Sequence, residues 1–505
     1  MRHLNFYHWI YSDNKGAKQR FVRWLLFILF SVVLVGFKLR YHELWKDEWQ
    51  AWFVARDMPF SQMLGFLYYE GHPSLWYIYL KFGTFVSGVF SSQDVALQVL
   101  HSVPVVCILY MLLVRMRFST VFAALLCLGY FIAFEYGVVN RGYAFVILFA
   151  LMAAYWMEDV MENMLKIGVC LFLLCQTEVQ GVFIAFLLFF YCIWKDYDLK
   201  NSFFTVLNTK PFKVLGLSFG MGALFFLLTV FPRGDQETLS RAYNGNSRNT
   251  IFETFATAFQ GHFVNTFWIG AQSDTKAFGY NTLGLTLSCL LLILLSWIFY
   301  NHKKLLTIWL LSIVLFLGFA TLLFSGGVRQ WGMFYIVFVV LLYLWRSERA
   351  FFKLDKLLIL TSIIAFQIYY SVLAFQKDWA IPYSNGAAAA AFVKEKIPAA
   401  VPIIAINKFY ATPVIGYANR SMIEMPSGEP FTYSRWLDKV YLPSETDFQL
   451  YTEYKKIGGL VVMSGEPLPL QQYPHLEFWT VFKSASLKNE NFYFYQYKKQ
   501  AKQAN

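Results

Sequence analysis

A short stretch of the sequence gathers acidic residues and a histidine in a chain that is otherwise largely apolar. Asp47 and Glu48 lie in WKDEWQAW, and Glu70 and His72 follow in YEGHPSLWY. Ionisable side chains beside a membrane are costly, so such a cluster points to function. A carboxylate can accept a proton from a hydroxyl or an amine during a reaction. Asp47 and Glu48 are therefore the candidate catalytic residues.

Two arginines stand at the ends of later apolar segments. Arg141 lies in NRGY, together with Tyr143, and Arg329 follows two glycines. A guanidinium group binds phosphate through a planar fork of N–H groups. Carboxylates and arginines on one side of a membrane suit the transfer of a group from a lipid phosphate, and a polyprenyl-phosphate sugar has this form. Arg141, Tyr143 and Arg329, with Glu70 and His72, are the candidate substrate-binding residues.

Most of these residues also have a structural interpretation. Asp47 and Glu48 fit an interfacial turn, and Glu70 with His72 fits the cap of a helix that begins near Pro73. The two arginines fit snorkelling anchors at the membrane surface. These interpretations stay open at the level of the sequence.

Three further residues bear on the site. Glu70 and His262 are the candidate ligands if a divalent metal takes part, although His262, in FQGHF, also fits a belt of aromatic residues. Glu178 stands between two short apolar segments, where function and helix spacing explain it equally well. The six cysteines all fall within apolar segments, and their spacing indicates neither a disulfide framework nor a zinc site.

The composition is that of a polytopic membrane protein. Of 505 residues, 57% are hydrophobic and 20% aromatic, and the formal net charge is +12. The basic residues form short runs between apolar segments, as loop charges on one side of a membrane do, which argues against nucleic-acid binding.

The basic residues also predict a topology. Lys15, Lys18, Arg20 and Arg23 precede the first apolar run, so the N-terminus is expected in the cytoplasm. Residues 75–90 are too short for a span of about 20 residues, and we interpret them as a helix on the outer surface. If residues 75–90 crossed the membrane, every later loop that carries basic residues would lie on the opposite side of it. We expect eleven spans, at residues 24–37, 95–114, 119–134, 142–157, 167–175, 181–194, 214–231, 283–300, 305–324, 331–345 and 357–375.

Two domains are expected. Residues 1–375 form a transmembrane catalytic domain with an external loop at 40–94 and a second external segment at about 232–280. Residues 376–505 change composition and predict an extracytoplasmic α/β domain. Its expected elements are a helix at 387–396, buried strands at 401–406 and 458–463, and an aromatic edge strand at 491–497.

The acidic pair after the first span, the EGHPSLWY element and NRGY, in this order, resemble the GT-C glycosyltransferases. The resemblance is to the branch with protein O-mannosyltransferases and lipid A aminoarabinose transferases, glycosyltransferase families 39 and 83. It implies a polytopic helical fold with Asp47 as the catalytic base. Ser74 stands where relatives have a second proline, and Asn140-Arg141 lacks the acidic residue of many relatives, which leaves a divalent metal cofactor open.

Together these features favour an inverting glycosyltransferase in the cytoplasmic membrane. The expected partners are a polyprenyl-phosphate sugar donor and an extracytoplasmic acceptor, which is a glycolipid, a polysaccharide or a protein. Two alternatives remain, a lipid or polysaccharide transporter (flippase) and a non-catalytic membrane scaffold. A transporter is disfavoured because charges are sparse at mid-span and inverted repeats are not evident.

The topology is tested by labelling single cysteines. We expect Arg117→Cys and Asn244→Cys, each in a cysteine-free background, to react with a membrane-impermeant thiol reagent from opposite sides of the membrane. The reason is that basic residues alternate between successive loops. Reaction of both variants with reagent added only outside would contradict the eleven-span topology.

Overall fold

The structure is a computed structural model that describes residues 7–12, 16–196, 205, 208–231, 250–268, 280–346, 353–435, 440–487 and 490–498. The chain divides into two compact units. Unit 1 consists of Met1–Lys38, Gly71–Trp76 and His101–Gln376. Unit 2 consists of Leu39–Glu70, Tyr77–Leu100 and Lys377–Asn505.

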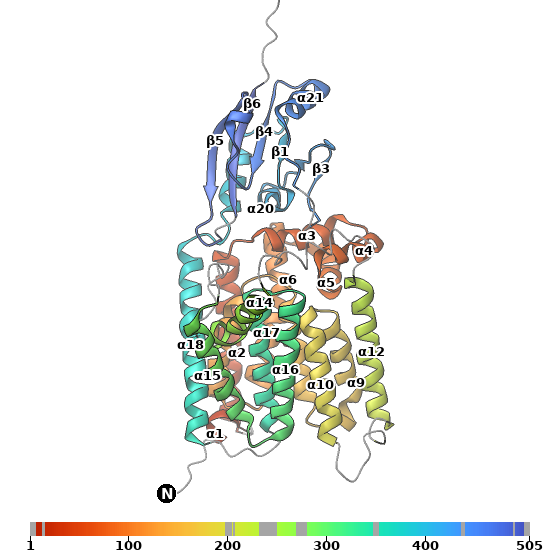
Figure 1. Cartoon of the computed structure of the whole chain (residues 1–505), viewed down its shortest axis with the longest axis vertical. Coiled ribbons are helices and arrows are strands. Elements are labelled where there is room, and N and C mark those ends of the chain that lie inside the picture. Colours follow the sequence, from red (N-terminus) through yellow and green to blue (C-terminus); the bar gives the residue numbers. More distant parts are fainter. Residues whose placement is uncertain are drawn as a thin grey trace, which may run out of the picture. The chain divides into compact units, whose positions relative to one another are not determined.

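Unit 1 is helical, and several of its helices run side by side (Figure 1). Those that lie wholly or mostly in it are α1 (Tyr7–Ile10), α2 (Ala17–Tyr41), α6 (Gln93–Tyr110), α7 (Thr120–Cys127), α8 (Tyr143–Trp156), α9 (Val160–Cys175), α10 (Val179–Asp196), α12 (Lys210–Val230), α14 (Ile251–Gln260), α15 (Thr282–Phe299), α16 (Lys303–Leu322), α17 (Val328–Trp345) and α18 (Leu354–Ala380). Among the described residues there are π-helical turns at η2 (Met111–Arg115) and η4 (Gly261–Asn265), which continue α6 and α14, and at η3 (Phe131–Glu135), which follows α7 after a short turn.

Within the described residues, seven helices are long and apolar enough to cross a membrane. They are α2, α6 with η2, α12, α15, α16, α17 and α18, and the shorter helices α8 and α10 are also apolar. The chain is therefore a multi-pass membrane protein. All eleven segments predicted as spans contain helix, but the number that cross stays a prediction.

Helix α17 is the core of unit 1. Every residue in it is buried except Arg329 and Gln330 in its first turn. A helix that is apolar on all sides is stable only when neighbours surround it, and α17 packs against α8, α10 and α16. Arg329 therefore stands at the end of the most enclosed helix of this unit.

Two segments that lie between predicted spans of unit 1 contain helix. Residues 160–166 belong to α9, which begins after Asp159, and the Asp159 side chain accepts a hydrogen bond from the Glu162 backbone N–H at 3.1 Å. An acidic N-cap followed by Glu at the third helical position favours a helix start. In the predicted external segment 232–280, α14 and η4 are helical, while most of the remainder, with Asn244, lies outside the described residues.

Unit 2 combines helices with a mixed sheet. Its helices are α3 (Lys46–Asp57), α4 (Phe60–Glu70), α5 (Leu75–Val86), η1 (Ser87–Val89), α19 (Gly386–Lys396), α20 (Lys408–Ala418), α21 (Glu445–Lys455) and η7 (Leu470–Gln472), where α5 begins in unit 1. Its strands are β1 (Ile403–Ala405), β2 (Met422–Ile423), β3 (Pro430–Phe431), β4 (Gly459–Ser464), β5 (Leu476–Lys483) and β6 (Asn491–Lys498). At 12 residues, α5 is shorter than a span requires.

The strand order is β3-β2-β1-β4-β6-β5, with β1 parallel to β2 and β4, and β6 antiparallel to β4 and β5. Ile404 lies opposite Ile423 on one side and Val462 on the other. The predicted helix and two predicted buried strands are confirmed as α19, β1 and β4. The prediction of an edge strand at 491–497 is wrong, because β5, which was not predicted, pairs along the open side of β6.

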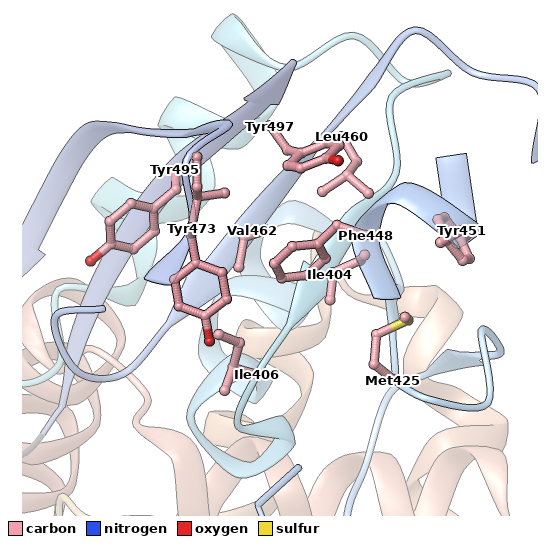
Figure 2. Close-up of a cluster of buried hydrophobic side chains, with 11 residues drawn as sticks. Ile404, Ile406, Met425, Phe448, Tyr451, Leu460, Val462, Tyr473, Tyr495 and Tyr497 are labelled. Atoms are coloured by element: carbon pink, nitrogen blue, oxygen red, sulfur yellow. The ribbon is translucent and has the colours of Figure 1, made fainter. Parts of the chain in front are cut away.

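The two faces of the sheet bury different side chains. On one face Phe448 of α21 packs with Ile404 and Val462 in an apolar cluster (Figure 2). Strand side chains alternate between the faces, so Phe494 of β6 points the other way, where Phe392 of α19 lies 5.2 Å from it between ring centroids.

Glu490 is a buried carboxyl next to the start of β6. Its Oε1 accepts a hydrogen bond of 2.5 Å from Ser384 Oγ, which precedes α19. Burial raises the pKa of Glu490 to about 8, although the nearby Lys46 charge acts in the opposite direction. The folded protein therefore favours the protonated form, whereas the unfolded chain ionises near the ordinary value of 4.5.

The raised pKa predicts how stability depends on pH. Protonated Glu490 adds to the free energy of unfolding. This contribution is complete below about pH 4.5 and is lost as the pH rises through about 8. Glu490→Gln does not titrate and can still accept the bond from Ser384. We expect its stability relative to the wild type to increase by about 1 kcal/mol per pH unit between pH 5 and pH 8.

The measurement is thermal or denaturant unfolding of the purified full chain in detergent at both pH values. Glu477→Gln is the matched control, since that side chain on β5 is 63% exposed. An unchanged difference between Glu490→Gln and the wild type across this range would contradict the assignment.

Candidate active site

The candidate residues fall into two groups, one in each unit. Unit 2 contains Asp47, Glu48 and Glu70, and unit 1 contains His72, Arg141, Tyr143, His262 and Arg329.

Asp47 lies in the first turn of α3. This helix begins at Lys46, directly before Asp47. The backbone N–H of Trp45 donates to Glu48 Oε2 at 2.9 Å, which closes the N-terminus of the helix. Asp47 is partly exposed, and a carboxylate in the first turn is favoured by the helix dipole.

Glu48 differs from its neighbour because it is fully buried in a charged triad. Its Oε1 is 3.4 Å from His42 Nε2, and His42 Nδ1 is 2.9 Å from Asp378 Oδ2. Burial alone would lower the pKa of His42, but the two carboxylates outweigh it and raise the pKa to about 10. His42 is therefore an imidazolium that holds the two acidic groups together, and this contact fixes the start of α3.

Glu70 joins three helices of unit 2. Gln50 Nε2 donates to Glu70 Oε1 at 2.8 Å, and Tyr77 O–H donates to Glu70 Oε2 at 2.9 Å. The Gln50 amide also exchanges hydrogen bonds with the backbone of Ser434. Glu70 is thus bonded to side chains of α3 and α5, an arrangement that orients these helices.

In unit 1, His72 lies between Glu178 and Arg141. His72 Nδ1 is 2.7 Å from Glu178 Oε2, and His72 Nε2 is 2.9 Å from Arg141 Nη2. The two loops that carry this contact are also bonded to each other, since the Leu75 backbone N–H donates to Gln176 O at 2.9 Å. The structure therefore brings the predicted residues His72 and Arg141 together and adds Glu178.

Arg329 contacts a carboxylate from a π-helical turn. Its Nε donates to Glu135 Oε1 at 2.6 Å, and Tyr130 O–H donates to Glu135 Oε2 at 2.6 Å. Glu135 is the last residue of η3, and both Glu135 and Arg329 are largely enclosed. Turns of this kind often occur where a helix must present a functional side chain.

Tyr136 connects these two arginine contacts. Its O–H donates to the backbone oxygen of Arg329 at 2.6 Å, and its ring lies 5.7 Å from that of Tyr143. Burial raises the pKa of Tyr136 well above its ordinary value, and the charges of Glu135 and Glu178 raise it further. Gln330 Nε2 in turn donates to the hydroxyl oxygen of Tyr143 at 2.8 Å.

We call this group the arginine cluster. It consists of Arg141, His72 and Glu178, the pair Arg329 and Glu135, and the tyrosines Tyr136 and Tyr143.

The sequence pattern does not single out Glu135 or Asp378, and it leaves the role of Glu178 open. Glu135 and Asp378 are each a single acidic residue at the end of a long apolar stretch. A charge beside apolar helices is costly, so an isolated acid in that position is the signal that identifies such residues.

His262 is buried among aromatic rings of unit 1. Its Nδ1 donates to the backbone oxygen of Ala258 at 2.8 Å, and the rings of Phe316 and Phe334 lie within about 6 Å of it. In the part of the chain that the structure describes, no group of three or more His, Cys, Asp or Glu is placed to hold a metal ion. The aromatic-belt interpretation of His262 fits these contacts.

The architecture is similar to that of two solved structures. The crystal structure of ArnT from Cupriavidus metallidurans in the apo state aligns with 95% of this chain and 98% of its own, at a TM-score of 0.54 and 11% identity. The chain therefore has an ArnT-like fold. ArnT from the same organism bound to undecaprenyl phosphate aligns at a TM-score of 0.48 and 12% identity over 94% and 97% of the two chains. No protein-family model and no curated relative matches the sequence.

The charged triad predicts a large cost for losing its histidine. His42→Asn leaves Glu48 and Asp378 buried side by side without a positive partner, and breaking such a group typically costs about 3–5 kcal/mol. We expect the free energy of unfolding of the purified chain to fall by this amount in His42→Asn.

The matched control is His475→Asn. His475 also contacts a carboxylate, Glu445 at 2.7 Å, but this pair is partly exposed, so we expect a loss below about 1 kcal/mol. Equal losses of unfolding free energy in His42→Asn and His475→Asn would show that burial does not determine how much the triad stabilises the fold.

Proposed function

We propose that the protein is an inverting glycosyltransferase that moves a sugar from a polyprenyl-phosphate-linked donor to an extracytoplasmic acceptor. The observation that carries the proposal is the arginine cluster, which gathers two guanidinium groups at the ends of apolar helices. The ArnT-like fold supports it as an analogy of architecture. The acceptor is a glycolipid, a polysaccharide or a protein at the outer face of the cytoplasmic membrane.

Arg141 and Arg329 bind the phosphate of the donor in this proposal. Arginine carries five N–H donors in one plane, so a guanidinium can hold a carboxylate and a phosphate at the same time. Glu135 and the His72–Glu178 pair orient the two groups before the donor arrives. As the sugar leaves, negative charge grows on the lipid phosphate, and oriented cations stabilise that charge without rearrangement.

Asp47 is the base that activates the acceptor. The acceptor oxygen or nitrogen attacks the anomeric carbon while Asp47 takes its proton. The bond between the anomeric carbon and the phosphate oxygen breaks, and the lipid phosphate departs with the electron pair. A single displacement of this kind inverts the anomeric centre. Glu48, which is buried against His42, positions the helix start that carries Asp47.

The two alternatives make different demands on these residues. A scaffold requires no proton acceptor at Asp47, and a transporter would move the lipid without transferring its sugar. In this proposal the N-terminus is cytoplasmic and residues 376–505 lie outside, where the sheet would influence the choice of acceptor.

The test compares variants of Asp47 and Arg329 expressed in cells that lack the gene. The readouts are the profiles of glycolipids, polysaccharides and glycoproteins, and binding of undecaprenyl phosphate to the purified chain. Asp47→Asn is expected to lower transfer about 10²- to 10⁴-fold while lipid binding is retained, because a general base contributes a factor of that size. Arg329→Ala should weaken lipid binding, and Arg329→Lys should restore it only in part because the planar fork is lost.

Asp57→Asn is the matched control. Asp57 ends the same helix α3, where it pairs with Arg56 and accepts from Thr432, and its loss should leave transfer near the wild-type level. Wild-type transfer by Asp47→Asn would exclude it as the base. Identical profiles with and without the gene would overturn the transferase assignment.

A further inference from the structure

We propose that Glu178 is a positioning residue that sets the tautomer of His72, so that His72 accepts a hydrogen bond from Arg141 and holds this guanidinium in place. The proposal rests on the proposed function only in taking Arg141 as a ligand of the donor phosphate.

The hydrogen-bond donors fix the direction of this contact. A guanidinium can only donate, so the 2.9 Å contact between Arg141 Nη2 and His72 Nε2 requires a lone pair on Nε2. A neutral imidazole then carries its proton on Nδ1, which faces Glu178 Oε2 at 2.7 Å. An Nε2–H tautomer would set two donors against each other at Arg141 and remove the donor at Glu178. Only the Nδ1–H tautomer satisfies both contacts.

Glu178 is held firmly enough to enforce this choice. Its side chain is 5% exposed and that of His72 is 21% exposed, so water competes weakly for the bond. Its backbone oxygen accepts from Gly181 N–H at 2.9 Å, at the start of α10, where the helix dipole favours a negative side chain.

Gly142 leaves the space that this carboxylate occupies. A Cβ at that position would lie 3.2 Å from Glu178 Oε1 and 3.1 Å from Trp76 Cβ. Because Gly142 directly follows Arg141, the carboxylate approaches the backbone of the NRGY element closely. The loop that carries Arg141 and the start of α10 are therefore in direct contact.

The charge of Glu178 is what gives the bond its strength. A hydrogen bond to an ionised acceptor is roughly twice as strong as one between neutral groups. Glu178→Gln keeps the size of the side chain and removes the charge, so it should lower the population of the Nδ1–H tautomer. Arg141 then loses part of its support, and we expect binding of undecaprenyl phosphate to weaken about five- to tenfold.

The direct readout is the nitrogen spectrum of the histidines in the purified full chain without ligand. With ¹⁵N-labelled histidine, a protonated and an unprotonated ring nitrogen are separated by chemical shift, and His72→Asn assigns the His72 signal among the eight histidines. The wild type should show a neutral ring with Nδ1 protonated, and Glu178→Gln should change that signal. An Nε2–H ring or an imidazolium in the wild type would overturn the proposal.

The second readout is binding of undecaprenyl phosphate to Glu178→Gln, Arg141→Ala and the double variant. If Glu178 acts through Arg141, the double variant binds no more weakly than Arg141→Ala alone. Glu162→Gln, an exposed residue of α9, is the control for general effects. Additive losses, or unchanged binding in Glu178→Gln while Arg141→Ala is defective, would contradict the positioning role.

The two readouts separate this proposal from the proposed function. If Arg141→Ala binds the lipid normally, the donor role of Arg141 fails. The nitrogen spectrum still decides whether Glu178 sets the His72 tautomer, because it is recorded without ligand.

Discussion

The cost of placing charge beside apolar helices governs the candidate site. Each arginine of the arginine cluster is held by a carboxylate, Arg329 directly through Glu135 and Arg141 through His72 and Glu178. A buried ion pair gains little net stability, since desolvation offsets the attraction, whereas loss of one partner is expensive. Pairs of this kind therefore add little to stability, but they hold the charged side chains in a fixed orientation. Loss of one member of the cluster therefore leaves its partner without a balancing charge.

The same constraint separates the roles of Asp47 and Glu48. Successive residues on a helix point about 100° apart, so two adjacent acids cannot face the same surroundings. Glu48 faces His42 and is enclosed, while Asp47 is partly exposed in the first turn of α3. An enclosed carboxylate with a charged partner is held in place, and a partly exposed one can meet a substrate. In the proposed mechanism the acidic pair accordingly has one positioning residue, Glu48, and one reactive residue, Asp47.

Local patterns predicted much of the fold and few of the contacts in the site. Long apolar runs predicted the helices, and turn residues with β-branched runs predicted β1 and β4. Contacts such as Arg329 with Glu135 join residues 194 positions apart, and His42 with Asp378 joins residues 336 apart. Nothing in the residues near either partner specifies the other. The same holds for β6, whose pairing with β5 depends on the whole sheet and not on the aromatic sequence of β6.

These facts explain how the architecture can match ArnT while the sequences share few residues. Apolar helices tolerate exchange among hydrophobic residues of similar volume, so the helical framework places weak demands on identity. The demands fall instead on a few polar positions whose charges must be balanced. Ser74 Oγ donates a hydrogen bond to Gln176 Oε1 at 3.3 Å and so helps to hold the His72 loop. What the framework has to preserve is the balance of charge at these positions, and different side chains can meet that requirement.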